Sequence, residues 1–457
     1  MIKRAGADVF MKEFFTLFLP IALGNLFTFG STFTAHLMVS GLGGDASAGI
    51  FLSNQVMQLL VFAITGIEAV VTVLGAQRMG DSDRKGFSGV ASKAALLALL
   101  LSILLTIICI IMPNKVLSLF SRRKSVGNAA KDYLRLLSLG FPLYALTRIL
   151  IASGKCVNRE RVALAAPLVS LAVTVAIGLL TVNGPLGLGA MGAGISILSA
   201  RAAELAVTVI MLSAGDNSGA LSARALIRGV GYPSPAFLKT LLPIILGQAA
   251  WGAETLLATS LMSRYADGFA AVSFGVLTAL SNLAYALMSG ASSAVGIIVS
   301  HKVGGGADRG DYMSAARLGQ LVFLGIGAVG AILILALKVP FVHIYGLTAA
   351  DAELLGMLTP ILALTFIATS YSASTLFGII KSGGDVNFVL ITDASMLLFL
   401  TLPVSLAVFS SGLGVAELYI ATRLVHLFKC PIAYSRVRWG RWARRLTKSA
   451  RSGTISI

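Results

Sequence analysis

The chain of 457 residues is 56% hydrophobic and only 12% charged, whereas soluble globular chains carry about 25% charged residues. This composition excludes a protein whose whole surface faces water, and it indicates that lipid covers much of that surface. The net charge of +17 favours basic loops on the cytoplasmic side of a membrane over binding to nucleic acid.

Twelve apolar runs are long enough to be transmembrane helices, because about 20 apolar residues cross the hydrocarbon core. We therefore predict an all-α polytopic membrane protein with twelve transmembrane helices. The predicted spans are Phe14–Val39, Phe51–Leu74, Ala94–Met112, Tyr133–Ala152, Ala163–Thr181, Gly189–Ser213, Leu238–Met262, Phe269–Val299, Leu318–Leu337, Leu354–Ile380, Phe388–Phe409 and Val415–Tyr434.

A polar interval between the sixth and seventh runs divides the chain into two predicted lobes. Residues 215–235 are rich in charged residues, glycine and proline, and they form the longest polar interval inside the chain. We predict a six-helix N-terminal lobe over residues 1–214 and a cytoplasmic linker over residues 215–235. Residues 236–457 would form a six-helix C-terminal lobe with a basic cytoplasmic tail.

Two sequence echoes indicate that the halves arose by duplication. The sequence PIALGN at residues 20–25 recurs as PIILGQ at residues 243–248. The sequence SGKCVN at residues 153–158 recurs as SGGDVN at residues 382–387, and we expect both copies to form tight cytoplasmic turns. Internal duplication in a strongly apolar chain is typical of membrane transporters.

The distribution of Lys and Arg predicts the orientation in the membrane. With both termini in the cytoplasm, most of the 36 basic residues fall in cytoplasmic segments, above all in the tail from Arg436 onward. The basic segment around residues 122–124 is an exception, since it would face outside. We therefore expect a multi-pass protein of a bacterial or archaeal plasma (inner) membrane.

A series of short motifs runs through the whole chain. They are LPI at 19–21, LMV at 37–39, VLGAQRMG at 73–80, AVG at 294–296, KSGGD at 381–385 and GRW at 440–442. The series resembles the multidrug and toxic compound extrusion (MATE) transporters of the wider MOP flippase and exporter superfamily. The resemblance implies two pseudo-symmetric six-helix lobes around a central cleft. That cleft would alternately face the two sides of the membrane while exchanging Na⁺ or H⁺ for an organic, often cationic, solute.

The chain departs from the family at the usual positions of its cation ligands. Many members carry an aspartate in the first span just before the LMV motif, where this chain has Ala35 followed by His36. In the fifth span, Thr174 and Gly178 stand where many members carry asparagine or aspartate, and Ser370 replaces an acidic residue of the tenth span. The resemblance therefore leaves open whether the coupling ion is H⁺ or Na⁺, and whether transport is ion-coupled.

Two glutamates lie near the centres of predicted spans, Glu68 in the second and Glu254 in the seventh. A charged side chain at a helix centre costs about 2.5–3.5 kcal/mol, so each needs a partner or a function. These spans would line the cleft in the family architecture, where a low dielectric favours the protonated carboxyl that proton exchange requires. Glu254 and Glu68 are therefore candidates for ion coupling, and the alternative is that each is paired with an arginine or hydrogen-bonded for packing.

Other polar residues in the spans have both structural and functional interpretations. Arg201 and Glu204 are three residues apart on one helical face, which predicts a structural ion pair. Arg148 either neutralises a carboxylate of its own lobe or contacts an anionic substrate. His36 is either a hydrogen-bonded interface residue or a proton relay, so it joins Arg148 among the substrate and ion candidates. Asp393 in the eleventh span is a weaker candidate.

The sequence contains no P-loop, nucleophile triad, His-Glu-x-x-His motif or metal-ligand spacing, so we expect neither an enzyme nor a cofactor or metal beyond the coupling ion. The first hypothesis is a monomeric secondary active exporter of amphipathic, cationic small molecules. The alternative is a lipid-linked saccharide flippase of the same superfamily, whose cleft should be basic, as Arg148 and Arg201 would allow. A receptor or scaffold is disfavoured, because the sequence has no soluble sensory or effector domain.

Overall fold

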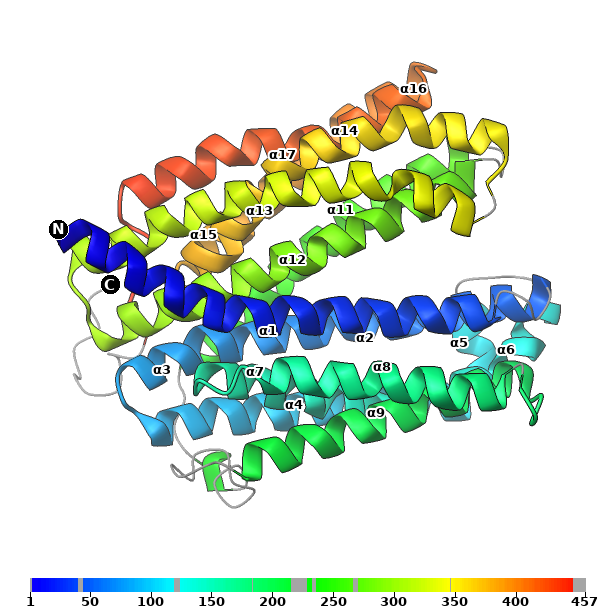
Figure 1. Ribbon diagram of the computed structural model, residues 1–457, viewed down its shortest axis with the longest axis horizontal. Helices are drawn as coiled ribbons and strands as arrows, with labels where there is room; N and C mark the ends of the chain where they lie inside the picture. The colour runs from blue at the N-terminus through cyan, green and yellow to red at the C-terminus, as the bar shows by residue number, and fades with distance from the viewer. Residues whose placement is uncertain are drawn as a thin grey trace. The chain divides into compact units, whose positions relative to one another are not determined.

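The structure, a computed structural model, describes residues 2–39, 44–118, 124–182, 184–214, 228–231, 236–265, 270–345 and 347–446 (Figure 1). Within these ranges nearly every residue is helical, and the β contact is one isolated bridge between Gly384 and Ala443. The predicted fold class, an all-α polytopic membrane protein, is confirmed.

The helices of the first half follow the predicted spans, although some spans contain more than one helix. The fourth predicted span is divided at Gly140, because Pro142 lacks a backbone N–H and is tolerated in the first turn of a new helix. The elements are α1 (Ile2–Val39), α2 (Gly44–Val70), the π-helical segment η2 (Val71–Gly75), α3 (Ala76–Gly80), α4 (Arg84–Ile111), α5 (Pro113–Ser118), α6 (Lys124–Leu139), α7 (Phe141–Cys156), α8 (Val162–Thr181) and α9 (Gly189–Ser213).

The second half has the same order of spans with different interruptions. Eleven helical stretches of the described chain are long and apolar enough to cross a membrane. The twelfth predicted span, α17, is 24 residues long and differs from these in carrying Arg423, His426 and Lys429. The elements are α11 (Ala236–Tyr265), α12 (Ala270–Gly305), α13 (Arg309–Ile344), α14 (Ala349–Ser374), η3 (Thr375–Lys381), α15 (Val386–Met396), η4 (Leu397–Thr401), α16 (Leu402–Ser410) and α17 (Val415–Arg438).

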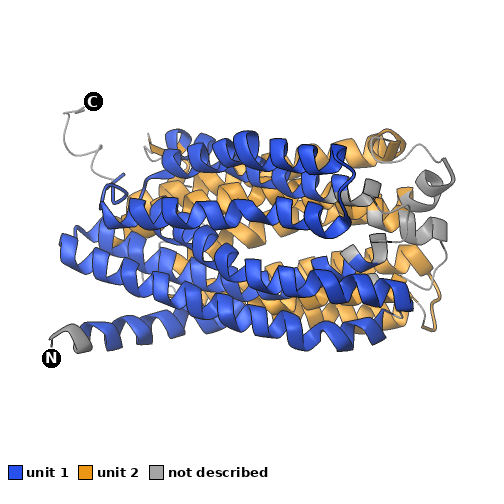
Figure 2. Cartoon of the chain, turned by 90° about the horizontal axis from the view of Figure 1, so that it is seen from above, with its two compact units in different colours: residues 1–22, 238–457 blue, residues 23–237 orange. Residues whose placement is uncertain are grey.

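The chain groups into two compact units, coloured separately in Figure 2. We call Leu23–Phe237 the N-terminal unit, and Met1–Ala22 together with Leu238–Ile457 the C-terminal unit. The predicted linker over residues 215–235 lies outside the described residues except for residues 228–231. The lobe boundaries drawn from the sequence therefore remain a prediction.

Helix α4 exposes its large apolar side chains and buries its small ones, as expected for a helix whose outer face contacts lipid. Its large side chains, such as Leu100, Leu104 and Ile111, are exposed. Small residues let helices approach closely, while lipid tails can solvate the leucine and isoleucine side chains on the outer face. The buried face accordingly consists mainly of small and hydroxyl-bearing residues, among them Ala91, Ala94, Ala98, Ser102, Thr106 and Cys109.

The first repeated motif, PIALGN at residues 20–25 and PIILGQ at residues 243–248, places a glycine at the same helix crossing in each unit. In the N-terminal unit, a Cβ atom on Gly24 would lie 1.8 Å from the carbonyl oxygen of Ala163, so only glycine fits where α1 crosses α8. In the C-terminal unit, the equivalent Gly247 on α11 faces the backbone of Leu390 on α15, with 3.9 Å from such a Cβ to the Leu390 Cα. Both glycines thus pack against the fifth span of their half, as a duplication requires.

The two copies of the second repeated motif end their helices at different points. Residues 153–156 continue α7, and the turn follows at Asn158, which has a φ of 59°. In the other copy the turn lies at Gly384, with a φ of 105°. The predicted tight turn is therefore wrong for residues 153–156. The helical conformation there keeps Lys155 in a buried position, where it binds a carboxylate described below.

The segment after α17 folds back onto the loop between η3 and α15. Arg436 Nε donates to Asp385 Oδ2 at 2.9 Å, and Arg444 Nη2 lies 3.2 Å from Asp385 Oδ1. Trp442 is completely buried and donates its indole N–H to the carbonyl of Val437 at 3.1 Å. These contacts fix the end of α17 to the loop within the C-terminal unit.

Candidate functional site

Glu68 lies between two cations inside the N-terminal unit. Its Oε2 accepts hydrogen bonds from Arg148 Nη2 at 2.6 Å and Nε at 3.1 Å, and its Oε1 accepts one from Lys155 Nζ at 3.0 Å. Glu68 is near the end of α2, and the two cations lie about two turns apart on one face of α7. In this Glu68 cluster (Glu68, Arg148 and Lys155), two cations therefore face one carboxylate and occupy both of its oxygens.

A second ion pair continues this network on α9. Arg201 Nη1 lies 2.8 Å from Glu204 Oε2, and the Arg201 guanidinium stacks over the ring of Tyr144 at 4.8 Å. Tyr144 lies one turn before Arg148 on α7, so the two networks share a helix. Four of the predicted site residues thus fall into one region, where Arg148 pairs with Glu68 and Arg201 with Glu204.

Glu254, on α11 of the C-terminal unit, shares a lysine with a second carboxylate. Lys429 Nζ on α17 lies 3.5 Å from Glu254 Oε2 and 2.9 Å from Asp393 Oδ1 on α15. The side chains of Glu254, Asp393 and Lys429 are 8%, 3% and 4% exposed, so this Glu254 cluster is almost fully buried. Two carboxylates here share one ammonium group, which is the reverse of the charge ratio around Glu68.

Some buried polar atoms at the Glu254 cluster have no hydrogen-bond partner among the described residues. These include Asp393 Oδ2 and the Nδ1 of His426, which lies one turn before Lys429 on α17. A buried polar atom is nearly always paired, because leaving it unpaired costs about 1–3 kcal/mol. The Glu254 cluster therefore contains a buried carboxylate oxygen, Asp393 Oδ2, whose hydrogen-bonding capacity the described residues leave unused.

The remaining predicted positions contribute no further carboxylate. His36 lies within α1, but its side chain falls outside what the structure describes. Thr174 Oγ1 is 2.8 Å from Ser31 Oγ, and Ser370 Oγ donates to the carbonyl of Phe323 at 2.8 Å. Both hydroxyls thus serve contacts between helices of their own unit.

Lys155 and Lys429 were not predicted from the sequence as partners of the two glutamates, and Asp393 was named only as a weaker candidate. Lys155 fell in a predicted turn, and Lys429 lay near the end of the last span, where lysine commonly reaches the membrane surface. A signal for Lys429 was nevertheless present. Arg423, His426 and Lys429 recur every three residues, which puts basic side chains near one another on a mostly apolar helix.

Comparisons with known proteins agree with this architecture. A family model described as MatE matches residues 20–180. The multidrug resistance protein PmpM of Pseudomonas aeruginosa is 24% identical over 338 residues, which cover 73% of this chain and 71% of that protein. The probable multidrug resistance protein NorM of Bacillus cereus is 25% identical over 396 residues, covering 83% of this chain and 84% of NorM. The crystal structure of the eukaryotic MATE transporter AtDTX14 matches with a TM-score of 0.84 at 15% identity, covering 97% of this chain and 99% of that one, so the fold is shared.

Proposed function

Because the chain belongs to the MATE family of membrane transporters, we propose that it is a secondary active exporter of amphipathic, cationic small molecules. The names of its relatives, which are multidrug resistance proteins, support this class of substrate. Export would exchange the substrate for H⁺ or Na⁺ by alternating access, with no cofactor and no chemical step. The protein would act as a monomer in a bacterial or archaeal inner membrane, with both termini in the cytoplasm.

The excess of carboxylate in the Glu254 cluster is the observation that carries this proposal. Lys429 neutralises one negative charge, and its ammonium lies closer to Asp393 than to Glu254. Arg423 on the same helix as Lys429 also acts on Glu254 electrostatically, but among the described residues no ion pair joins it to either carboxylate. The second carboxylate therefore has room for a further cation in direct contact, because a bare charge in a low dielectric is costly. A proton, a sodium ion or a cationic substrate would each supply that charge, so their competition would couple export to the ion gradient.

The contacts favour different roles for the residues of the two clusters. We assign the exchanged cation to Glu254, because it is the less neutralised of the two carboxylates, and we assign to Asp393 the role of holding Lys429. Glu68 is a structural residue in this proposal, since both of its oxygens already accept hydrogen bonds from cations.

The alternative of a lipid-linked saccharide flippase receives less support. A flippase needs a basic surface for a pyrophosphate group, and Arg148 and Arg201 were the residues that favoured it. Each of these arginines binds a glutamate of its own unit, Glu68 or Glu204. Both arginines are therefore held by carboxylates, although Lys155 adds a third cation to the two glutamates. We retain the exporter as the proposal, because neither arginine is left without an acidic partner.

Dye accumulation in inside-out membrane vesicles tests the proposed exchange. Vesicles whose lumen is acidic or loaded with Na⁺ should accumulate ethidium from the medium, and collapse of the effective gradient should stop the uptake. Comparing the two gradients identifies the coupling ion. Uptake that is the same with and without either gradient would contradict ion-coupled export.

A further inference from the structure

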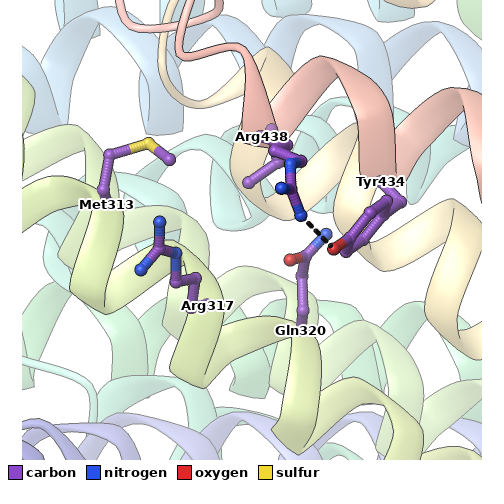
Figure 3. Close-up of a pocket in the computed structure, with 6 residues that line it drawn as sticks. Met313, Arg317, Gln320, Tyr434 and Arg438 are labelled. Carbon is purple, nitrogen blue, oxygen red and sulfur yellow. Dashed lines mark hydrogen bonds between the residues drawn. The ribbon is translucent and has the colours of Figure 1, made fainter.

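A pocket of about 470 Å³ lies between α13 and α17 in the C-terminal unit and contains no residue of the Glu254 cluster. Figure 3 shows side chains of the two helices facing one another across it. The volume falls within the range of about 300–1,000 Å³ that is usual for small-ligand sites. The pocket is lined by Met313, Arg317, Gln320, Tyr434, Val437 and Arg438.

Two arginines of the pocket have no described acid to neutralise them. No carboxylate of the described chain lies within ion-pair distance, 4.0 Å, of Arg317 or Arg438. The neighbouring Arg436 and Arg444 differ, because both bind Asp385. Two available guanidinium groups at one pocket favour a phosphate-bearing ligand, since the planar guanidinium matches phosphate geometry.

Both helices continue from these arginines as exposed apolar faces. On α13, Leu321 and Leu324 follow Arg317 by about one and two turns and are 65% and 42% exposed. On α17, Leu427 lies about three turns before Arg438 and is 49% exposed. At these spacings the leucines share a face with the arginine of their helix.

The two apolar faces extend in the same direction from the arginines. The start of α13 meets the end of α17, because the Arg309 guanidinium lies within 2.8 Å of a Cβ atom built on Gly440. Trp439, beside Arg438, is 66% exposed, and exposed tryptophan is typical of the boundary between membrane and water. The pocket is therefore cationic at the boundary, and exposed apolar faces of its two helices continue from it toward the membrane interior.

We propose that this pocket binds an anionic phospholipid. The lipid phosphate lies between Arg317 and Arg438, and an acyl chain follows the exposed leucines of the two helices. Tyr434 orients the head group site, because its hydroxyl accepts a hydrogen bond from Arg438 Nη1 at 3.1 Å. A soluble phosphate would use the arginines but leave the apolar faces without a role, so a lipid accounts for both features.

The test measures lipids retained by the full-length protein. Purified protein is mixed with dioleoylphosphatidylglycerol or dioleoylphosphatidylcholine, and the bound lipid is measured by native mass spectrometry. The double variant Arg317→Gln/Arg438→Gln should bind phosphatidylglycerol about tenfold to thirtyfold more weakly, the effect expected for two interfacial arginines. Its binding of phosphatidylcholine should not change. Equal phosphatidylglycerol binding by the wild type and this variant would overturn the proposal.

A matched control removes the same charge elsewhere. Arg84 and Lys85 are exposed at the start of α4, so Arg84→Gln/Lys85→Gln should bind phosphatidylglycerol like the wild type. A loss in this control equal to that in the pocket variant would also overturn the proposal, because net charge alone would then explain binding. Equal melting temperatures in phosphatidylcholine show that both variants are folded.

A second variant separates the lipid from a soluble anion. Leu321→Asn/Leu324→Asn keeps both arginines and should also weaken phosphatidylglycerol binding. Inorganic phosphate at millimolar concentration should neither displace the lipid nor stabilise the protein. If inorganic phosphate displaces the lipid and the leucine variant binds like the wild type, the pocket is a soluble-anion site and the lipid assignment is wrong.

Discussion

Glu68 in the N-terminal unit is bound by two cations of α7, whereas Lys429 in the C-terminal unit is shared by two carboxylates from different helices. Both oxygens of Glu68 accept hydrogen bonds. Asp393, by contrast, keeps one oxygen without a hydrogen bond from the described residues. The first cluster thus suits a structural role, while the second suits the exchange of a cation.

In each cluster one residue, Glu68 or Lys429, forms ion pairs with both of the other two residues. Removing that shared residue leaves two like charges buried without a counter-charge, whereas removing an outer residue leaves a one-to-one pair. The two clusters should therefore respond alike in stability when the equivalent positions are changed. They should differ in transport, because carboxylates outnumber the cation in the Glu254 cluster, whereas cations outnumber the carboxylate in the Glu68 cluster.

The largest expected effect follows from removing the shared residues. Glu68→Gln and Lys429→Met should each destabilise the protein by about 3–5 kcal/mol, the usual cost of leaving a buried charge unpaired. Folded yield after size-exclusion chromatography and the melting temperature measure this loss. Lys155→Met is the control, because the pair of Glu68 and Arg148 remains. The idea of a shared residue is wrong if Lys155→Met and Glu68→Gln lower the melting temperature equally.

The next effect concerns transport rather than folding. Glu254→Gln should fold normally, because Asp393 still neutralises Lys429, but gradient-driven export should fall by about tenfold or more, an increase of about 1.4 kcal/mol in the barrier. Ethidium uptake into inside-out vesicles measures this. Glu417→Gln, the same change at an exposed position of α17, should transport like the wild type. Wild-type transport by Glu254→Gln from about pH 6 to about pH 8 would make Glu254 a packing residue.

A double-mutant cycle sharpens the comparison further. Glu254→Gln and Asp393→Asn should each change stability little, but together they leave Lys429 buried without an acid. The double variant should therefore be less stable than the sum of the single variants, by about 0.5–3 kcal/mol, as is typical of residues in contact. Thermal unfolding in one detergent measures all four proteins. Strict additivity would mean that the two carboxylates do not share the lysine.

The smallest effect is expected at Arg201 and Glu204, which form an ion pair within one helix. Glu204→Ala leaves Arg201, which is 18% exposed and still stacks over Tyr144, so we expect a loss of only about 1 kcal/mol. Arg201→Ala leaves Glu204, which is 4% exposed, without its partner and should cost more. The double variant should be less than additive, because the second change removes a charge that has already lost its partner. Full folded yield with selective loss of transport in these variants would show that the pair serves the mechanism.

Most of the fold could be predicted, because the length of an apolar run is set by the thickness of the membrane. The interruptions within spans were harder to predict. The break at Gly140 had a local signal in Pro142, but the π-helical segments η2, η3 and η4 occur in continuous apolar sequence. Their wider turns depend on packing against neighbouring helices, which a single sequence does not specify.

The sequence predicted the two glutamates of the candidate site but not their lysine partners, whose burial also depends on helix packing. Glu68 and Glu254 stand out as charges inside apolar runs. Their partners Lys155 and Lys429 lie near the ends of spans, where a lysine usually reaches water. Their burial depends on which helices pack together, α2 with α7 in one unit and α15 with α17 in the other.

The segment after α17 has a practical consequence for handling the protein. Trp442 is completely buried, and Arg436 and Arg444 both bind Asp385 in the loop between η3 and α15. A purification handle or fluorescent reporter should therefore be joined beyond Leu446, since truncation at Gly440 would remove the indole that anchors this end of α17. Lys429 lies on that helix about two turns before Arg436, so a trimmed tail would disturb the position of the ammonium group that the two carboxylates share.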